Sequence, residues 1–173
     1  MSETRLYFAY GSNINLDQMA YRCPNATVIG PVTLEGYELT FRGRADGNGV
    51  ANIEPKQGAS VPGLLWSITS DCERALDRYE GTPRLYVQQD VTVHDASGRE
   101  YAVMAYVMTD LFREPAMPSP FYFQGIRDGY AQNGMDEKPL EDALMKCRAE
   151  VGAILAQRQP RRGRTNKRRD ESR

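Results

Sequence analysis

The stretch Phe8-Ala9-Tyr10-Gly11-Ser12-Asn13 decides how this chain is interpreted, because a short aromatic segment runs directly into a turn of glycine and small polar residues. We predict a strand over 5–10. Glycine is unfavourable inside a strand, so Gly11 indicates the end of this strand and a close approach of the backbone to another group. Such a turn presents backbone N–H groups, which makes it a candidate site for an anion or an oxyanion.

Several β-type segments follow this turn, and glycines separate them. A short helix comes first, at 16–23, capped by Asn13 or Asn15 and stopped by Pro24. We expect strands at 26–33, 37–42, 50–54, 62–68, 86–93 and 100–108, with a turn at 95–98 between the last two. The many glycines favour a sheet that curls into a small barrel.

Three further helices are predicted from their end signals. Ser70-Asp71-Cys72-Glu73 has the spacing of a capping box for a helix over 71–79, and Gly81 stands where that helix stops. Ser119-Pro120 opens a helix that Asn133-Gly134 closes, and an apolar stripe predicts a last helix after it. This mixed order indicates an α+β fold, with a small, mixed, barrel-like β-sheet flanked by helices.

The composition is that of one globular domain, since 40% of the 173 residues are hydrophobic. We predict that this domain spans 1–157. The segment 158–173 carries eight Lys or Arg residues and two acidic ones, so we expect a disordered tail, on which any contact with nucleic acid would depend. No apolar run approaches the roughly 20 residues of a membrane helix, and we expect a cytoplasmic protein.

Side chains that usually carry catalysis are scarce. The single histidine, His94, is predicted at the end of a hairpin, and Cys23, Cys72 and Cys147 are far apart and are expected to be reduced thiols. No segment has metal-ligand spacing, and the Gly11 turn lacks the GxxxxGK[ST] and GxGxxG patterns, so we expect neither a metal nor a cofactor. The groups that remain as candidates for catalysis are carboxylates, tyrosines and backbone amides.

Glu80 is the carboxylate of most interest. It lies at the C-terminal end of a predicted helix, where exposed carbonyls disfavour a negative charge by roughly 0.3–1 kcal/mol. This field and neighbours such as Tyr79 would raise the pKa of the carboxyl toward that of a useful base. The residues alone leave open the alternative of a solvated surface glutamate.

Three motifs occur in a fixed order: a YGSN turn at 10–13, an LDxxEG segment at 76–81 followed by Tyr86, and Pro118-Ser119-Pro120-Phe121-Tyr122 leading into a helix. Together they resemble the gamma-glutamylcyclotransferase-like (AIG2-like) family. The resemblance implies a barrel-like sheet and a pocket in which the YGSN turn faces Glu80 as general acid/base. The residues that it implies in substrate binding are Tyr7, Phe8, Ala9, Tyr10, Gly11, Ser12, Asn13, Tyr86 and Tyr122.

The activity implied by the resemblance is an intramolecular acyl transfer, of the transferase or lyase type, on a small gamma-glutamyl amide. The alpha-amine of the substrate attacks its own gamma-carbonyl, which releases 5-oxoproline and a free amine. Ser12 as a nucleophile is a competing interpretation, although no base accompanies it. A non-catalytic protein that binds a gamma-glutamyl-type metabolite on the same scaffold is the alternative from another class.

The sequence leaves the leaving amine open: an amino acid, a lysine side chain or another metabolite, with glutathione as one candidate. We expect Arg42, Arg44, Arg84 and the loop 112–118 to contribute to the outer wall of the pocket. The N–H groups of 11–13 are suited either to an oxyanion or to the alpha-carboxylate of the substrate. The oligomeric state, monomer or homodimer, is also left open.

Overall fold

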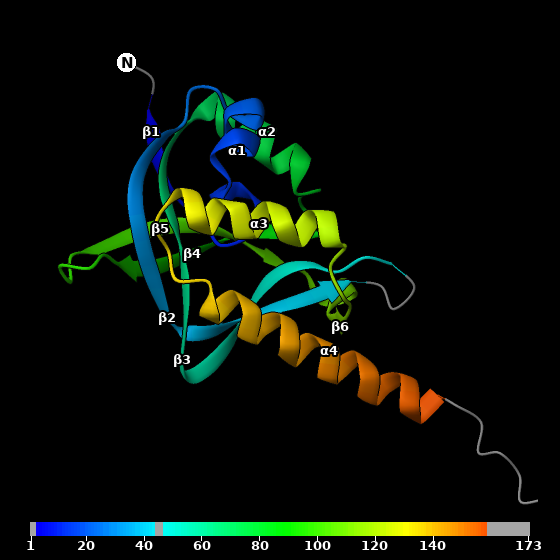
Figure 1. Cartoon of the computed structure of the whole chain (residues 1–173). Coiled ribbons are helices and arrows are strands. Elements are labelled where there is room, and N and C mark those ends of the chain that lie inside the picture. The colour runs from blue at the N-terminus through cyan, green and yellow to red at the C-terminus, as the bar shows by residue number, and fades with distance from the viewer. Residues whose placement is uncertain (1–2, 44–46, 159–173) are drawn as a thin grey trace, which may run out of the picture.

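The computed structural model describes residues 3–43 and 47–158. Its strands follow the order β3-β1-β5-β4-β2, and β3 also pairs with β2, so that the sheet closes into a five-stranded barrel (Figure 1). A short strand, β6 (Glu114–Pro115), adds to β2 outside the closed ring. Four helices lie around the barrel, and the predicted α+β architecture is confirmed.

The first strand lies between partners that run in opposite directions. β1 (Thr4–Ala9) is antiparallel to β3 and parallel to β5 (Glu100–Met108), with Tyr7 opposite Met104. β4 (Tyr86–His94) forms the predicted hairpin with β5. His94 ends that hairpin and pairs with Thr33 of β2, which completes the ring.

Two long strands replace four of the predicted short ones. β2 (Thr27–Gly43) and β3 (Val50–Thr69) pair antiparallel along most of their length, so the prediction of separate strands at 26–33, 37–42, 50–54 and 62–68 was wrong. The glycines of β2 do not end the strand. The register of its pairing with β3 shifts between Val28 and Gly30 and between Glu35 and Tyr37, and such β-bulges bend a strand while its pairing continues. These bends let one hairpin wrap around the barrel.

The helices begin at side-chain caps. α1 (Leu16–Arg22) follows a 3₁₀ turn, η1 (Ser12–Ile14), and is capped by Asn15, whose side chain accepts hydrogen bonds from two backbone N–H groups. α2 (Ser70–Tyr79) is capped by Thr69, one residue before the predicted capping box. α3 (Pro120–Gln132) is capped by Ser119, as predicted. A second 3₁₀ turn, η2 (Asp110–Phe112), precedes β6.

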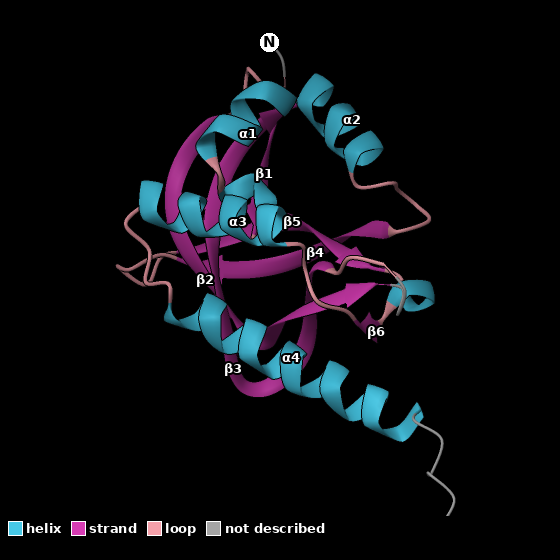
Figure 2. Ribbon diagram, turned by 45° about the vertical axis from the view of Figure 1, so that its right-hand side comes forward, coloured by secondary structure: helices cyan, strands magenta, loops and turns pink. Residues whose placement is uncertain are grey.

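The helices cover different parts of the barrel (Figure 2). α1 and α2 lie together at one end, and α3 crosses the side of the barrel below them. α4 (Lys138–Arg158) packs against β2 and then runs beyond the barrel (Figure 1). The predicted basic tail, apart from Arg158, lies outside the described residues.

The cysteines correct another prediction. Cys23, just after α1, and Cys72, in the first turn of α2, form a disulfide with a Cα–Cα distance of 5.1 Å, whereas Cys147 is a buried free thiol. The expectation of three reduced thiols was therefore wrong for two of them. The two cysteines are 49 residues apart, and nothing in the sequence indicates that α1 and α2 lie side by side.

Candidate active site

A cavity of about 180 Å³ lies where the end of β1, the end of α2 and the start of α3 meet. Eight of the ten predicted site residues line it: Tyr7, Tyr10, Gly11, Ser12, Asn13, Glu80, Tyr86 and Tyr122. Phe8 and Ala9 do not line the cavity and are buried in the core. Strand alternation explains Phe8, because neighbouring side chains of a strand point to opposite faces.

Gly11 lets the turn lie directly against β3. A Cβ atom on Gly11 would be 3.1 Å from the Cβ of Ala51 and 3.5 Å from the hydroxyl of Tyr122. The predicted close approach of the backbone is therefore present. A side chain at position 11 would therefore press against Ala51, and this lack of space favours glycine here.

Asn13 holds the turn in place through both ends of its side chain. Its Nδ2 donates to the hydroxyl of Tyr7 at 3.0 Å, and its Oδ1 accepts from Nη1 of Arg22 at 2.6 Å. The indole N–H of Trp66 donates to the Asn13 carbonyl at 3.0 Å. The side chain of Asn13 is thus committed to protein partners, while the N–H groups of Ser12 and Asn13 donate to no acceptor in the described part of the chain.

Glu80 lies at the C-cap of α2, where its own N–H donates to the Leu76 carbonyl at 2.8 Å. Gly81 follows with a φ of +66°, the left-handed conformation that ends a helix, as predicted. Burial raises the pKa of the Glu80 carboxyl to about 7, and the nearby positive charge of Arg22 opposes this rise. At neutral pH the carboxyl therefore exists both with and without its proton, which suits a group that accepts and returns a proton.

Two tyrosines bind the backbone of Ala51 in β3, one at its N–H and the other at its C=O. The hydroxyl of Tyr122 accepts from the N–H of Ala51 at 3.0 Å, and the hydroxyl of Tyr86 donates to the Ala51 carbonyl at 2.5 Å. Burial raises the pKa of both hydroxyls above their ordinary value, so both stay neutral at physiological pH. Tyr122 consequently keeps a proton to donate to a ligand, and Tyr86 keeps lone pairs to accept.

Ser12 does not have the surroundings of a nucleophile. Its hydroxyl lies 3.3 Å from the hydroxyl of Tyr79 and accepts from Nη1 of Arg22 at 3.3 Å. Neither a guanidinium nor a phenol hydroxyl is a general base of the kind that activates a serine. The geometry favours a binding role for Ser12.

The comparisons with known proteins agree with the motifs and the fold. A family profile described as "Gamma-glutamyl cyclotransferase, AIG2-like" matches residues 7–122. Gamma-glutamylcyclotransferases from Bos taurus and Homo sapiens are each 34% identical to this chain over 147 residues, which cover 80% of this chain and 75% of those proteins. The chain belongs to this enzyme family.

A solved structure of a gamma-glutamyl cyclotransferase carries the same fold as this family member. The two superpose with a TM-score of 0.72 at 29% sequence identity, over 90% of this chain and 99% of that one. The closed barrel with its surrounding helices is thus shared along nearly the whole length of the solved enzyme.

Other residues at the cavity of this cyclotransferase-family chain were missed in the sequence. Five lining residues were not predicted: Val50, Ala51, Tyr79, Leu85 and Tyr106. The hydroxyl of Tyr106 donates to Oδ1 of Asp77 at 2.6 Å and so ties β5 to the last turn of α2. Tyr79 was named in the sequence only as a neighbour of Glu80 and not as a binding residue, and no local pattern marks the other four.

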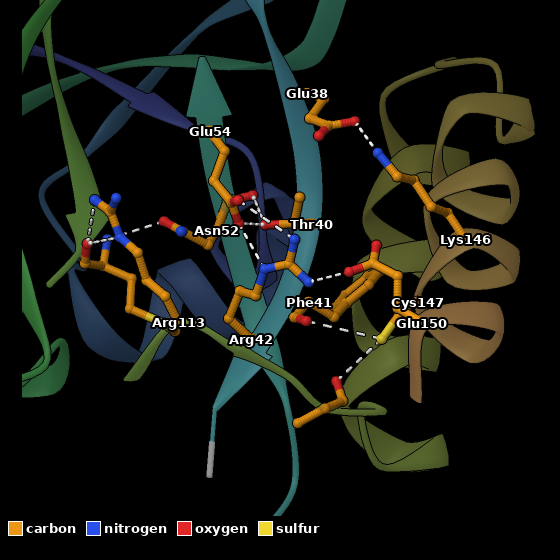
Figure 3. Close-up of polar contacts among 12 residues, drawn as sticks. Glu38, Thr40, Phe41, Arg42, Asn52, Glu54, Arg113, Lys146, Cys147 and Glu150 are labelled. Atoms are coloured by element: carbon orange, nitrogen blue, oxygen red, sulfur yellow. Dashed lines mark hydrogen bonds and ion pairs between the residues drawn. The ribbon is translucent and has the colours of Figure 1, made fainter. Parts of the chain in front are cut away.

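The predicted outer wall was partly wrong. Arg42 lies away from the cavity, where it pairs with Glu54 of β3 and Glu150 of α4 (Figure 3). Neither Arg84 nor the loop 112–118 lines the cavity, and Arg44 lies outside the described residues. An arginine in a strand gives no sign in the sequence of which face it occupies when the strand bends.

Within residues 3–43 and 47–158, no group of three or more His, Cys, Asp or Glu side chains is arranged to hold a metal ion. Of the helices in this same part of the chain, none combines the length and the apolar character needed to span a membrane.

Proposed function

We propose that this protein is a gamma-glutamyl cyclotransferase in which Glu80 acts as the general acid/base on a gamma-glutamyl amide. The observation that carries the proposal is a carboxyl with a pKa of about 7 in the same cavity as the YGSN turn. The relatives named above support the choice of reaction, since they are named gamma-glutamylcyclotransferases.

The reaction needs a bent substrate. The alpha-amino nitrogen attacks the gamma-carbonyl carbon, a five-membered ring closes, and the bond from that carbon to the leaving nitrogen breaks. The products are 5-oxoproline and a free amine, and no water is consumed. Orientation alone can accelerate such intramolecular reactions strongly, so a cavity that folds the glutamyl chain supplies much of the rate.

Glu80 accepts and donates protons in turn in this proposal. An alpha-amine with a pKa of about 8 is mostly protonated at pH 7, so ionised Glu80 first removes a proton and thereby creates the nucleophile. The protonated carboxyl then donates to the leaving nitrogen as its bond to carbon breaks. The carboxylate formed in this way accepts the second proton that the attacking nitrogen loses when it becomes the lactam N–H, and the released amine takes up that proton. A pKa near 7 allows both steps, because neither form of the carboxyl is strongly preferred.

The turn and the tyrosines would orient the glutamyl group. The N–H groups of Ser12 and Asn13 are suited to the oxyanion that develops on the gamma-carbonyl, or to the alpha-carboxylate of the substrate. The Tyr122 hydroxyl accepts a hydrogen bond from Ala51, so its proton is free to be donated to the substrate. The Tyr86 hydroxyl donates its proton to Ala51, so its lone pairs are free to accept from the substrate. Ser12 would contribute its backbone rather than its hydroxyl.

The test is release of 5-oxoproline from a panel of gamma-glutamyl amides whose leaving groups are amino acids, simple alkylamines, the lysine side-chain amine and the cysteinylglycine of glutathione. We expect turnover of at least one class by the wild type and a loss of about 10³-fold in Glu80→Gln, whose amide cannot accept a proton.

Glu141→Gln is the matched control, because Glu141 is an exposed glutamate of α4 far from the cavity. It should retain wild-type turnover. A wild type that binds these amides without releasing 5-oxoproline would instead indicate the non-catalytic binding protein. Release of 5-oxoproline at the wild-type rate by Glu80→Gln would refute the assignment of Glu80.

A further inference from the structure

Arg22 connects the two motifs that form the cavity, although it does not line the cavity itself. It is the last residue of α1, and its guanidinium is partly buried between the YGSN turn and the end of α2. Nη1 donates to Asn13 at 2.6 Å and to Ser12 at 3.3 Å. Nη2 donates to the hydroxyl of Tyr79 at 2.7 Å.

The contact with Tyr79 uses both the ring and the hydroxyl. The Cζ atom of Arg22 lies 3.7 Å from the centroid of the Tyr79 ring, a cation–π distance. Gln18, one turn earlier on α1, accepts from Nη2 at 3.0 Å and fixes the plane of the guanidinium. A planar group with donors on two nitrogens can bridge two elements in this way, whereas the single nitrogen of lysine cannot.

We propose that Arg22 is a positioning residue of this site, which fastens Tyr79, and with it the adjacent Glu80, to the Ser12–Asn13 turn. The inference rests on the proposed function of Glu80. In this proposal Arg22 fixes the distance between the Glu80 carboxyl at the end of α2 and the backbone N–H groups of the turn that follows β1. Because both groups must meet one small substrate, loosening this bridge lowers turnover more than it weakens binding.

The second consequence is electrostatic. Among residues 3–43 and 47–158, Arg22 is the charged group whose field acts on the Glu80 carboxyl, and it lowers the pKa that burial raises. The other titratable side chains that line the cavity in the described part of the chain are phenols: Tyr7, Tyr10, Tyr79, Tyr86, Tyr106 and Tyr122. Burial raises the pKa of Tyr7, Tyr10, Tyr86 and Tyr122, which keeps these four neutral at pH 7. Two further arginines near Glu80 in the sequence, Arg78 and Arg84, are exposed. Removing the Arg22 charge must therefore raise the pKa of Glu80.

The first experiment compares Arg22→Met, Arg22→Lys and Tyr79→Phe in steady-state kinetics between pH 5 and 9. We expect Arg22→Met to lower kcat about 30-fold with KM changed less than about threefold, and to move the acidic limb of kcat/KM to higher pH. Arg22→Lys should restore the wild-type position of that limb while kcat stays about 10-fold low, since the charge returns without the bridge.

A double-mutant cycle tests whether Arg22 acts through Tyr79. Tyr79→Phe keeps the ring and removes the hydroxyl, and we expect kcat about fivefold below wild type. In Arg22→Met/Tyr79→Phe the loss should equal that of Arg22→Met alone within about twofold. Losses that simply multiply would overturn the proposal, because they would mean that the two residues act independently.

Two controls separate positioning from general stability and general charge. Arg42→Met removes an arginine that is bound to two glutamates away from the cavity, and Arg78→Met removes an exposed positive charge two residues before Glu80. Both variants should keep the wild-type kcat per folded molecule, and the acidic limb of their kcat/KM profile should stay at the wild-type pH. An Arg22→Met variant that behaves like these controls would refute the inference.

A measurement without turnover distinguishes failure of this inference from failure of the proposed function. The Glu80 carboxyl is titrated by ¹³C NMR in the wild type and in Arg22→Met, and its signal is assigned from its absence in Glu80→Gln. We expect a higher midpoint in Arg22→Met, whatever the substrate is. An unchanged midpoint would overturn the electrostatic role of Arg22, even in a protein with full cyclotransferase activity.

Discussion

Glu54 and Glu80 are two glutamates of this protein whose carboxyl pKa values shift in opposite directions. Glu54, on the face covered by α4, accepts hydrogen bonds from Arg42 and Thr40, and these bonds outweigh burial and lower its pKa (Figure 3). Glu80, in the cavity, has its pKa raised to about 7 by burial. The difference lies in the partners of each carboxylate rather than in the residue type.

The two regions are also held together by different means. On the α4 face, Arg42 bridges Glu54 and Glu150, and Lys146 bonds Glu38 at 2.5 Å (Figure 3). At the cavity end, a disulfide joins α1 to α2, and the Arg22 bridge extends that link to the YGSN turn. Ion pairs stabilise a docked helix, whereas the cavity carboxylate forms no direct ion pair within residues 3–43 and 47–158, which leaves its charge available for chemistry.

The largest effect is expected from the disulfide at the cavity end. Replacing Cys23 and Cys72 together by alanine should lower the free energy of unfolding by about 4 kcal/mol, because a closed loop of about 50 residues no longer restricts the unfolded chain. Chemical denaturation measures this loss. A count of thiols in the denatured wild type should find one, that of Cys147, and a count of three would contradict the disulfide.

The α4 face should respond almost as strongly to loss of its central arginine. Arg42→Met leaves Glu54 and Glu150 without their shared partner, and we expect the free energy of unfolding to fall by about 3 kcal/mol. Denaturation in urea measures the loss, and kcat per folded molecule should not change. A drop in kcat together with the drop in stability would mean that the two regions are coupled.

The pH dependence of turnover should report the cavity carboxylate and not those of the α4 face. With a pKa of about 7, Glu80 loses most of its ionised form between pH 7 and pH 5, and kcat/KM should fall about 50-fold over that interval. The substrate amine is protonated throughout this range and contributes no change of its own. Activity that stays flat down to pH 5 would indicate an unperturbed carboxylate.

The smallest effect is a gain in stability from removing the cavity carboxylate. The pKa of Glu80 is higher in the folded state than its ordinary value of 4.5, so the folded protein binds the proton more tightly, and stability falls as the pH rises from about 4.5 through 7. A rise from 4.5 to about 7 corresponds to about 3 kcal/mol at pH 8, and screening by solvent lowers this figure because Glu80 is only half-buried. Glu80→Gln removes this cost and should be more stable than wild type by about 2 kcal/mol at pH 8. Thermal or urea unfolding should show the difference vanishing below pH 4.5.

Local signals in the sequence predicted most elements correctly. Asn15, Ser119 and Gly81 mark ends of helices with short-range hydrogen bonds or a left-handed backbone, and their roles depend on neighbours a few residues away. The glycines of β2 and β3 were misjudged as breaks. A glycine in a strand can end it or bend it, and the pairing partner along the other strand decides which of the two occurs.

The candidate site divides in the same way. Glu80 and the YGSN turn stood out in the sequence, since each motif is contiguous and breaks a local rule. Ala51, Leu85 and Tyr106 could not be predicted, because they reach the cavity only through the curvature of three different strands or loops. Arg22 follows the same principle: its partners Asn13 and Tyr79 lie 9 and 57 residues away in the sequence.

The sequence by itself determined the YGSN turn, the position of Glu80 at a helix end and the family to which both motifs point, because these features depend on contiguous residues. Only the tertiary structure decided which side chains surround Glu80, that Cys23 meets Cys72, and that Arg22 bridges the two motifs. The physical reason is closure of the barrel. Closure brings distant segments together around Glu80, and the resulting burial of its carboxyl raises its pKa.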